Sequence, residues 1–404
     1  MRLIRTAAAP PRRAVAAGSA AALAAALAAG CSTDASLADD VVGVGVIQEA
    51  TGTYANYAKQ FNGGFKAGLD LAGGGTGVIA GRKVKVTYLD SGGNAAKAIS
   101  QAKDLIGKGY KFIVGPVDSG VAQQLAPLAW QNKVVFIPDG STDESTGANR
   151  YTFRASMQTW QQIATTAEYL GLAGKRVVLL GQDSAFGQTY GASLKTYLAK
   201  KGLPPAAAEV AVPMGAQDFT PFAVKVKNAR PDVLFVAFAG TAKARMFRAL
   251  DEQGVLDKAA ATAELPLAAE YTAFGDSAGK ILYYARHFAG AVDTPEDRAL
   301  SAGARKHGAP NEQISSNGFT TAQMIQRAVT EGGGRDADKM VKALEGWRFQ
   351  GPKGPFEIRS ADHAMLQPML VARLVKDGAS WKPKLVKALD PADTAPPPAP
   401  MAVK

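Results

Sequence analysis

From residue 41 onward, short apolar runs alternate with helical stripes of apolar side chains. Residues 41–47 are almost continuously apolar, as in a strand that is buried on both faces. The next apolar residues fall at i, i+3, i+4, i+7 and i+11, which predicts one face of a helix. They are Tyr54, Tyr57, Ala58, Phe61 and Phe65. The alternation then predicts strands at 84–90, 112–115 and 134–137, and helices at 94–107 and 119–131.

The same alternation starts again near residue 151. It predicts strands at 176–180, 209–212 and 233–237, and helices at 186–200 and 220–228. Two successive βαβαβ runs indicate two doubly wound parallel sheets, an α/β fold. The chain of 404 residues also exceeds what one hydrophobic core usually supports, so two domains are expected.

The first 30 residues have the order of a secretory signal: positive charge, then an apolar stretch, then small residues. The apolar stretch 14–29 is shorter than the roughly 20 residues that span a bilayer. No basic cluster follows it to stop transfer. A signal peptide over 1–30 is therefore preferred to a membrane-spanning helix, and the mature protein is expected to be exported.

The segment Leu-Ala-Ala-Gly-Cys that ends at Cys31 resembles a bacterial lipobox, although Ala28 stands where leucine is usual. Cys31 is the only cysteine of the chain, which favours acylation over a disulfide. Each buried CH₂ of an acyl chain contributes roughly 0.8 kcal/mol to membrane attachment. We therefore expect a lipid anchor that faces the periplasm or the cell exterior, and a polar tether over 31–40. The proline-rich tail 389–404 is expected to be disordered.

The formal net charge is +11, which raises the question of a nucleic-acid partner. Lys and Arg are scattered among Asp and Glu, however, and no basic run with interleaved aromatic residues occurs. A solvated basic surface explains the composition better than nucleic-acid binding.

Candidate catalytic and metal-binding patterns are weak. The three histidines are not spaced as helical metal ligands, and no phosphate-binding loop motif occurs. Residues 275–279 match the letters G-x-S-x-G of a nucleophile elbow centred on Ser277. That elbow needs a strand before it and a helix after it, whereas a β-like run, 281–284, follows here. A polar turn is preferred, so neither an enzyme nor a cofactor or metal is expected.

Binding chemistry is better supported, because ligands of open parallel sheets lie beyond the carboxyl ends of the strands. After strand 112–115, Ser119 can present its hydroxyl beside the free N–H groups of the following helix. Such a helix start favours a carboxylate. The alternative is an ordinary N-cap serine. After strand 134–137 come Gly140 and Thr142, for which the alternative is a polar turn.

Several stretches together resemble the type I periplasmic-binding proteins of the branched-chain-amino-acid and amide class of ABC importers. The resemblance runs from about 41 to 386, and the order and spacing of the stretches make it specific. They are GVGVIQEATGTYANYAKQFNGGFKAGLDLA, GRKVKVTYLDSGGNAAKAISQAKDLI, FIVGPVDSGVAQQLAPLA, NRYTFRASM, GQDSAFGQTYGASL, GAQDFTPFAVKVKNARPDVLFVAF and GPKGPFEIRSADH.

The resemblance implies two lobes joined by three crossovers, near 155–157, 284–289 and 349–355. The N-terminal lobe would comprise 41–156 and 288–350, and the C-terminal lobe 157–287 and 351–388.

The resemblance also implies site residues. Ser119 and Thr142 would hold the ligand carboxylate, and Gly140 would offer backbone groups. Tyr57 would contact the ligand, as would Phe186, which stands where the family usually has tyrosine. For both rings, core packing is the alternative. Glu270 is the nearest candidate for binding an ammonium group, with a solvated surface acid as the alternative.

The implied function is that of an extracytoplasmic solute-binding lipoprotein that passes an amino acid, amide or small organic acid to ABC permease subunits. We expect a monomer. A nutrient-sensing lipoprotein without a transport role remains open, and an enzyme is the least favoured class. The sequence leaves the identity of the ligand open.

Overall fold

The computed structural model describes residues 36–140, 147–240 and 242–402. The predicted signal peptide, Cys31 and Thr142 therefore lie outside the described residues. Everything below concerns the unit Leu37–Lys404.

The first sheet has five strands in the order β2-β3-β1-β4-β5. β1 pairs in parallel with β3 and β4, and β4 pairs in parallel with β5, as the alternating pattern predicted. Only the short β2 is antiparallel. The bounds are β1 (Val41–Gln48), β2 (Val78–Ile79), β3 (Arg82–Asp90), β4 (Phe112–Val114) and β5 (Val135–Ile137).

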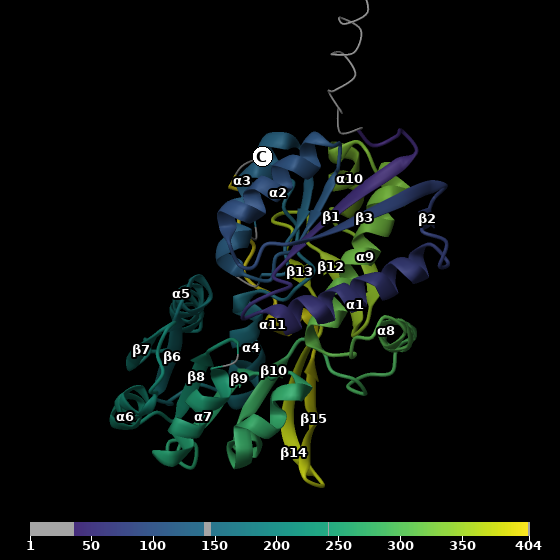
Figure 1. Ribbon diagram of the computed structural model, residues 1–404. Helices are drawn as coiled ribbons and strands as arrows, with labels where there is room; N and C mark the ends of the chain where they lie inside the picture. Colours follow the sequence, from purple (N-terminus) through teal and green to yellow (C-terminus); the bar gives the residue numbers. More distant parts are fainter. Residues whose placement is uncertain (1–35, 141–146, 241, 403–404) are drawn as a thin grey trace, which may run out of the picture. The chain divides into compact units, whose positions relative to one another are not determined.

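Helices cover both faces of this sheet (Figure 1). Val42, Val44 and Val46 of β1 share one core cluster with apolar residues of α1, α9 and α10. Ile47 packs on the other face, with α2 and α3. The near-continuous apolar run of β1 thus reflects burial on both faces. The bounds are α1 (Ala55–Ala72), α2 (Ala95–Gly107), α3 (Ser119–Asn132), α8 (Pro295–Lys306), α9 (Gln313–Gly332) and α10 (Ala337–Leu344).

Glycines allow α1 and α9 to approach each other closely. A Cβ added to Gly318 would overlap the carbonyl oxygen of Phe61, and one added to Gly64 would overlap that of Ser315. The absence of a side chain at Gly64 and Gly318 therefore permits the short distance between the two helices.

The second sheet has seven strands in the order β15-β14-β10-β9-β8-β6-β7. The five strands from β10 to β7 pair in parallel. The hairpin β14–β15 adds an antiparallel edge, which the helix–strand alternation did not predict. The bounds are β6 (Val177–Asp183), β7 (Ala208–Pro213), β8 (Val233–Ala237), β9 (Ala260–Glu264), β10 (Leu282–Ala285), β14 (Met369–Asp377) and β15 (Ser380–Leu389).

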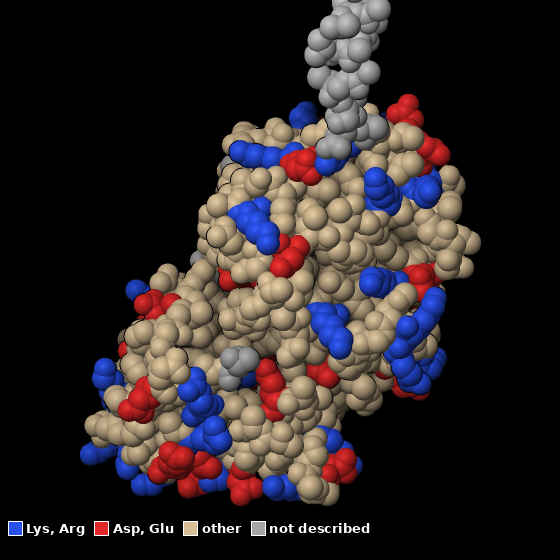
Figure 2. Space-filling model, viewed as in Figure 1, with Lys and Arg blue, Asp and Glu red and all other residues tan. Residues whose placement is uncertain are grey.

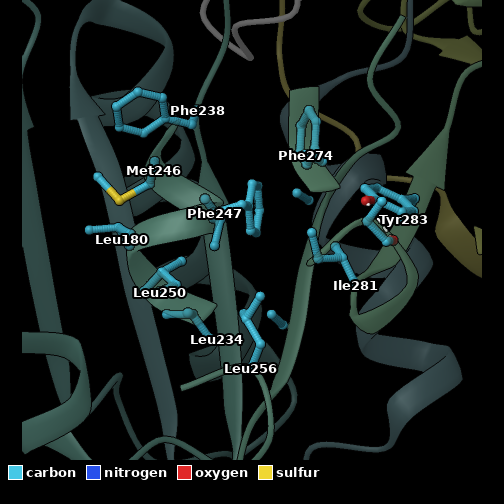
Figure 3. Close-up of a cluster of buried hydrophobic side chains, with 14 of the residues drawn as sticks. Leu180, Leu234, Phe238, Met246, Phe247, Leu250, Leu256, Phe274, Ile281 and Tyr283 are labelled. Carbon is cyan, nitrogen blue, oxygen red and sulfur yellow. Dashed lines mark hydrogen bonds between the residues drawn. The ribbon is translucent and has the colours of Figure 1, made fainter. Parts of the chain in front are cut away.

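Alternate residues of this sheet also face two helical layers. Val177 and Leu179 pack with α4 and α5. Leu180 and Leu234 pack on the opposite face with Met246 and Phe247 of α7, in the cluster shown in Figure 3. The helices are α4 (Thr159–Leu170), α5 (Ala185–Lys200), α6 (Thr220–Ala229), α7 (Lys243–Glu252) and the 3₁₀ segment η2 (Ala268–Lys280).

A small antiparallel sheet of β11 (Arg348–Gly351), β12 (Gly354–Ile358) and β13 (Met365–Leu366) precedes β14. Phe356, Ile358 and Met365 belong to the core cluster of the first lobe. The sequence analysis assigned 351–388 to the C-terminal lobe, whereas β12 and β13 pack into the core cluster of the first lobe. The chain joins the second sheet only at β14.

The C-terminal segment differs from the predicted disorder. It forms α11 (Pro391–Thr394) and then hydrogen-bonds to the first lobe. Arg359 Nη1 donates to the carbonyl of Pro396 at 2.8 Å, and the amide of Ala399 donates to Asp362 Oδ2 at 3.0 Å. The backbone of a proline has no N–H donor, but its carbonyl oxygen can accept a hydrogen bond. Arg359 supplies the donor for such a carbonyl, and Asp362 supplies the acceptor for a backbone amide of the segment.

The surface carries mixed charge. Figure 2 shows Lys and Arg interspersed with Asp and Glu over the viewed face. Within the described residues, no helix has both the length and the apolar character needed to cross a bilayer.

Candidate functional site

A cavity of about 150 Å³ is lined by residues of both lobes, at the carboxyl ends of strands from both sheets. The lining residues are Tyr54, Tyr57, Val117, Asp118, Ser119, Gly120, Ser184, Ala185, Phe186, Met214, Ala239, Glu264 and Arg286. Parallel sheets present ligand sites at such strand ends.

A larger groove of about 640 Å³ runs between α3 and α5. Its described lining includes Gln123, Trp130 and Gln188 but no charged side chain. The smaller cavity is the better candidate because convergent polar groups at strand ends mark a binding site.

The first wall of the cavity is the start of α3. Asp118 Oδ1 accepts a hydrogen bond from the amide of Val121 at 3.0 Å, so Asp118, not Ser119, is the N-cap. Ser119 occupies the first helical position and is 9% exposed. Within the described chain, its hydroxyl makes no hydrogen bond. The first amides of a helix also have no partner inside it, so this helix start can receive an anion.

Glu49, which directly follows β1, holds the turn before α3 in place by hydrogen bonds. Its Oε2 accepts from the amide of Val117 at 3.1 Å, and its Oε1 from that of Asp118 at 3.4 Å. Burial raises the pKa of Glu49 to about 7, although the hydrogen bond from Val117 opposes the shift. The sequence analysis missed this residue, which positions the turn.

Gly140 does not offer free backbone groups, contrary to the prediction. Its amide donates to the carbonyl of Pro116 at 3.1 Å, and its own carbonyl accepts from Arg154 Nη2 at 2.6 Å. A Cβ on Gly140 would lie 3.0 Å from the Cα of Ser119. Gly140 therefore supports Ser119 by close packing, and it is not among the lining residues.

The aromatic side chains predicted at the site do line it. Tyr57 is 7% exposed and lies 6.0 Å from Tyr54, measured between ring centroids. Phe186 comes from the opposite lobe, at the start of α5, where Ser184 caps the helix by accepting from the amide of Gly187 at 3.2 Å. Two helix starts, those of α3 and α5, thus face the same cavity.

Glu270 lies outside the cavity lining, contrary to the prediction. Its Oε2 accepts from the amide of Leu267 at 3.2 Å and so caps η2. The acid that the second lobe contributes to the cavity is Glu264, the last residue of β9.

Glu264 forms a buried ion pair with Arg286, which directly follows β10. Arg286 Nε donates to Glu264 Oε1 at 2.7 Å, and both side chains are less than 10% exposed. Arg286 Nη1 lies 3.9 Å from Asp139 Oδ1, which is too far for a hydrogen bond. The strand-end rule applied to the second sheet would have found both Glu264 and Arg286.

Asp139 links this pair to the first lobe. It is buried, and Asn317 Nδ2 donates to its Oδ1 at 2.6 Å. Burial raises its pKa to about 7, while the charge of Arg286 opposes the shift. Asp139 precedes Gly140, which packs on Ser119, so Asp139 lies next to the residues that support the start of α3.

The geometry does not support the hypothesis that Ser277 is the nucleophile of an elbow. Ser277 is buried in η2, and its hydroxyl donates to the carbonyl of Phe274 at 2.5 Å. In the described part of the chain, no group of three or more potential metal ligands comes together. Each histidine instead pairs with one carboxylate: His287 with Asp297, His307 with Asp70, and His363 with Glu345.

Comparison with known proteins places this architecture. The sequence model of the periplasmic binding protein family matches residues 41–379, which is most of the chain. The chain belongs to this family. It is therefore a solute-binding protein and not an enzyme, and its two mostly parallel sheets are those of a type I periplasmic binding protein.

Curated relatives of this periplasmic binding protein include the Leu/Ile/Val-binding protein BraC3 of Rhizobium johnstonii. The two are 24% identical over 320 residues, which cover 77% of this chain and 85% of the relative. The Leu/Ile/Val-binding protein homolog 6 of Brucella abortus is 26% identical over 362 residues, covering 86% of this chain and 91% of the relative.

Solved structures share the fold. One is the solute-binding protein of an ABC transporter from R. palustris in complex with 4-hydroxybenzoate. It has a TM-score of 0.79 and 22% identity, covering 87% of this chain and 97% of that one. The amino acid ABC transporter substrate-binding protein from Pseudomonas fluorescens Pf-5 has a TM-score of 0.77 and 20% identity, covering 88% and 97%.

Proposed function

We propose that this periplasmic binding protein is the lipid-anchored solute-binding subunit of an ABC importer and that it captures an amino acid or a related small carboxylate or amide. The observation that carries the proposal is the small cavity between the two lobes, with polar groups supplied by strand ends and helix starts. Relatives are named as Leu/Ile/Val-binding proteins, and a structural neighbour is described with an aromatic acid.

In the proposed mechanism, the ligand carboxylate docks first on the N-terminal lobe at Ser119 and the amides that start α3. The second lobe then closes and brings Phe186 and Arg286 over the ligand. Charge-assisted hydrogen bonds contribute roughly 1.5–3 kcal/mol each when shielded from water. The ligand-closed form is the one that the permease would recognise.

A thermal-shift screen of amino acids, amides and aromatic acids tests the capture of a small solute, since a ligand that binds only the folded state raises its melting temperature. Ser119→Ala should weaken binding of a carboxylate ligand by about tenfold or more. The exposed Ser360 is outside the cavity lining, so Ser360→Ala serves as the matched control. Unchanged calorimetric affinity in Ser119→Ala would rule out the assigned carboxylate contact.

The anchor and the transport role need separate tests. Cys31→Ser should move the protein from the membrane fraction to the soluble fraction if Cys31 is acylated. Cells that lack the protein should lose high-affinity uptake of the ligand. Normal uptake together with a lost transcriptional response to the ligand would instead favour nutrient sensing, the second candidate function.

A further inference from the structure

The acid best placed to hold a ligand ammonium is already neutralised by the protein. The carboxylate of Glu264 accepts from Arg286 Nε at 2.7 Å. The ammonium of Lys243, a side chain only 1% exposed, donates to the backbone carbonyl of the same glutamate at 3.4 Å. Glu264 thus stands between two buried cationic side chains, and a third cation from a ligand would be repelled by both.

Arg286 has donor capacity left over. Its side chain is 7% exposed and lines the cavity. Within the described residues, the buried Nη1 has no hydrogen-bond partner, and Asp139 Oδ1 lies 3.9 Å from it. A buried guanidinium N–H without a partner is costly, and a ligand carboxylate would satisfy it with a charge-assisted bond. Burial, and next the charge of Arg286, hold the pKa of buried Lys353 well below its ordinary value.

Three acids besides Glu264 lie at or near the cavity: Asp118, Glu49 and Asp139. Asp118 places its carboxylate on the amide of Val121, where it caps α3. Burial raises the pKa of Glu49 and that of Asp139 to about 7, which weakens the negative charge of both groups. The starts of α3 and α5 add partial positive charge from two sides.

We propose, building on the proposed function, that the ligand is an organic carboxylate without an α-amino group, and that the guanidinium of Arg286 is its cationic partner. Glu264 then orients Arg286 and does not receive an ammonium group. The ligand class is therefore aliphatic or aromatic acids, as distinct from amino acids.

Matched ligand pairs test this on the unmodified protein by calorimetry and thermal shift. L-leucine is compared with 4-methylpentanoate, and L-phenylalanine with 3-phenylpropanoate, so that each pair differs only in the amino group. 4-Hydroxybenzoate is compared with 4-hydroxybenzamide, which lacks the negative charge. In at least one pair, the acid should bind about tenfold or more tightly than its amino acid or amide, a difference of about 1.4 kcal/mol.

Two substitutions separate the roles of the ion pair. Arg286→Gln should weaken the acid by about tenfold or more and leave the amide unchanged, and Arg286→Lys should restore part of the affinity. Glu264→Gln removes the competing charge and should leave acid binding equal or tighter. Circular dichroism checks that each variant is folded. If a variant does not fold, the comparison of ligand pairs on the unmodified protein still tests the proposal.

The outcomes separate the two proposals. Tighter binding of the amino acid in both amino-acid pairs, abolished by Glu264→Gln, would overturn the inference and leave the solute-binding proposal standing. No stabilisation by any acid, amino acid or amide would overturn the proposed capture of small carboxylates and amides as well. Tighter binding of an acid, lost in Arg286→Gln, supports both.

Discussion

Glu49 is a buried acid that accepts hydrogen bonds from two backbone amides, those of Val117 and Asp118, in the turn before α3. Burial raises its pKa from 4.5 to about 7. The folded protein thus keeps this proton up to about pH 7, whereas the unfolded chain releases it near its ordinary pKa. The folded state binds more protons in this window, so the contribution of Glu49 makes the free energy of unfolding fall as the pH rises from about 4.5 to about 7.

Glu49→Gln should remove part of this pH dependence, since glutamine stays neutral and its oxygen can still accept from Val117. Urea unfolding at pH 5 and pH 7.5 measures the difference in stability between the two conditions. That difference should shrink in Glu49→Gln and stay unchanged in the control Glu252→Gln, which alters an exposed acid at the end of α7. An equal difference in both variants would show that Glu49 titrates normally.

Single residues at the cavity were predictable where they follow a strand directly. Ser119 follows β4 by a short turn, and it lines the cavity. Tyr57 and Phe186, which only the family resemblance implied, line it as well. The pairing of Glu264 with Arg286 could not be predicted, because it depends on the register between β9 and β10. Gly140 was misjudged because the donors that occupy its carbonyl, Arg154 and Ser156, lie 14 and 16 residues further along the chain.

At the scale of elements, the contact between α1 and α9 depends on the missing side chain of Gly318. Gly318→Ala would drive a methyl group into the carbonyl of Phe61, so the helices must separate. Overpacking of this kind costs roughly 1–3 kcal/mol. Gly107→Ala, at the end of α2 with open space around the added methyl, is the matched control.

Chemical denaturation measures both variants. The midpoint should fall clearly for Gly318→Ala and change little for Gly107→Ala. Equal denaturation midpoints for Gly318→Ala and Gly107→Ala would show that the two helices can accommodate the added methyl group, which would contradict this prediction.

The elements themselves differ in how far the sequence predicts them. The helices and parallel strands up to residue 237 were predicted closely, since each carries an apolar period of its own: the predicted strand 233–237 coincides with β8. Strand β9 and the helices α8, α9 and α10 were not predicted. The hairpin β14–β15 was not recognised. β15 alternates exposed lysines with half-buried residues, and such a strand is defined by its partner more than by its own pattern.

At the scale of the whole molecule, the proposed hinge motion can be blocked chemically. A Cβ added to Gly120 of α3 would lie 3.8 Å from the Cβ of Ala185 of α5. That separation is typical of a disulfide. Gly120→Cys with Ala185→Cys, in a background that carries Cys31→Ser, should therefore join the lobes under oxidising conditions.

The oxidised variant should bind and release ligand about tenfold or more slowly, because lobe opening gates the cavity. Stopped-flow measurements before and after dithiothreitol test this, and reduction should restore both rates. The two single-cysteine variants are the controls. Identical rates in the oxidised and reduced double variant would argue against a hinge.

The route of the last residues has a practical consequence. The chain leaves β15 of the second sheet, passes Arg359 and Asp362, and at Ala402 its amide donates to the carbonyl of Gly147 at 2.7 Å. A fluorescent reporter joined beyond Ala402 would therefore ride with the first lobe, although the strand before it belongs to the second. A sensor built from this protein would need its other fluorophore on the second lobe, for example on the exposed turn between β14 and β15.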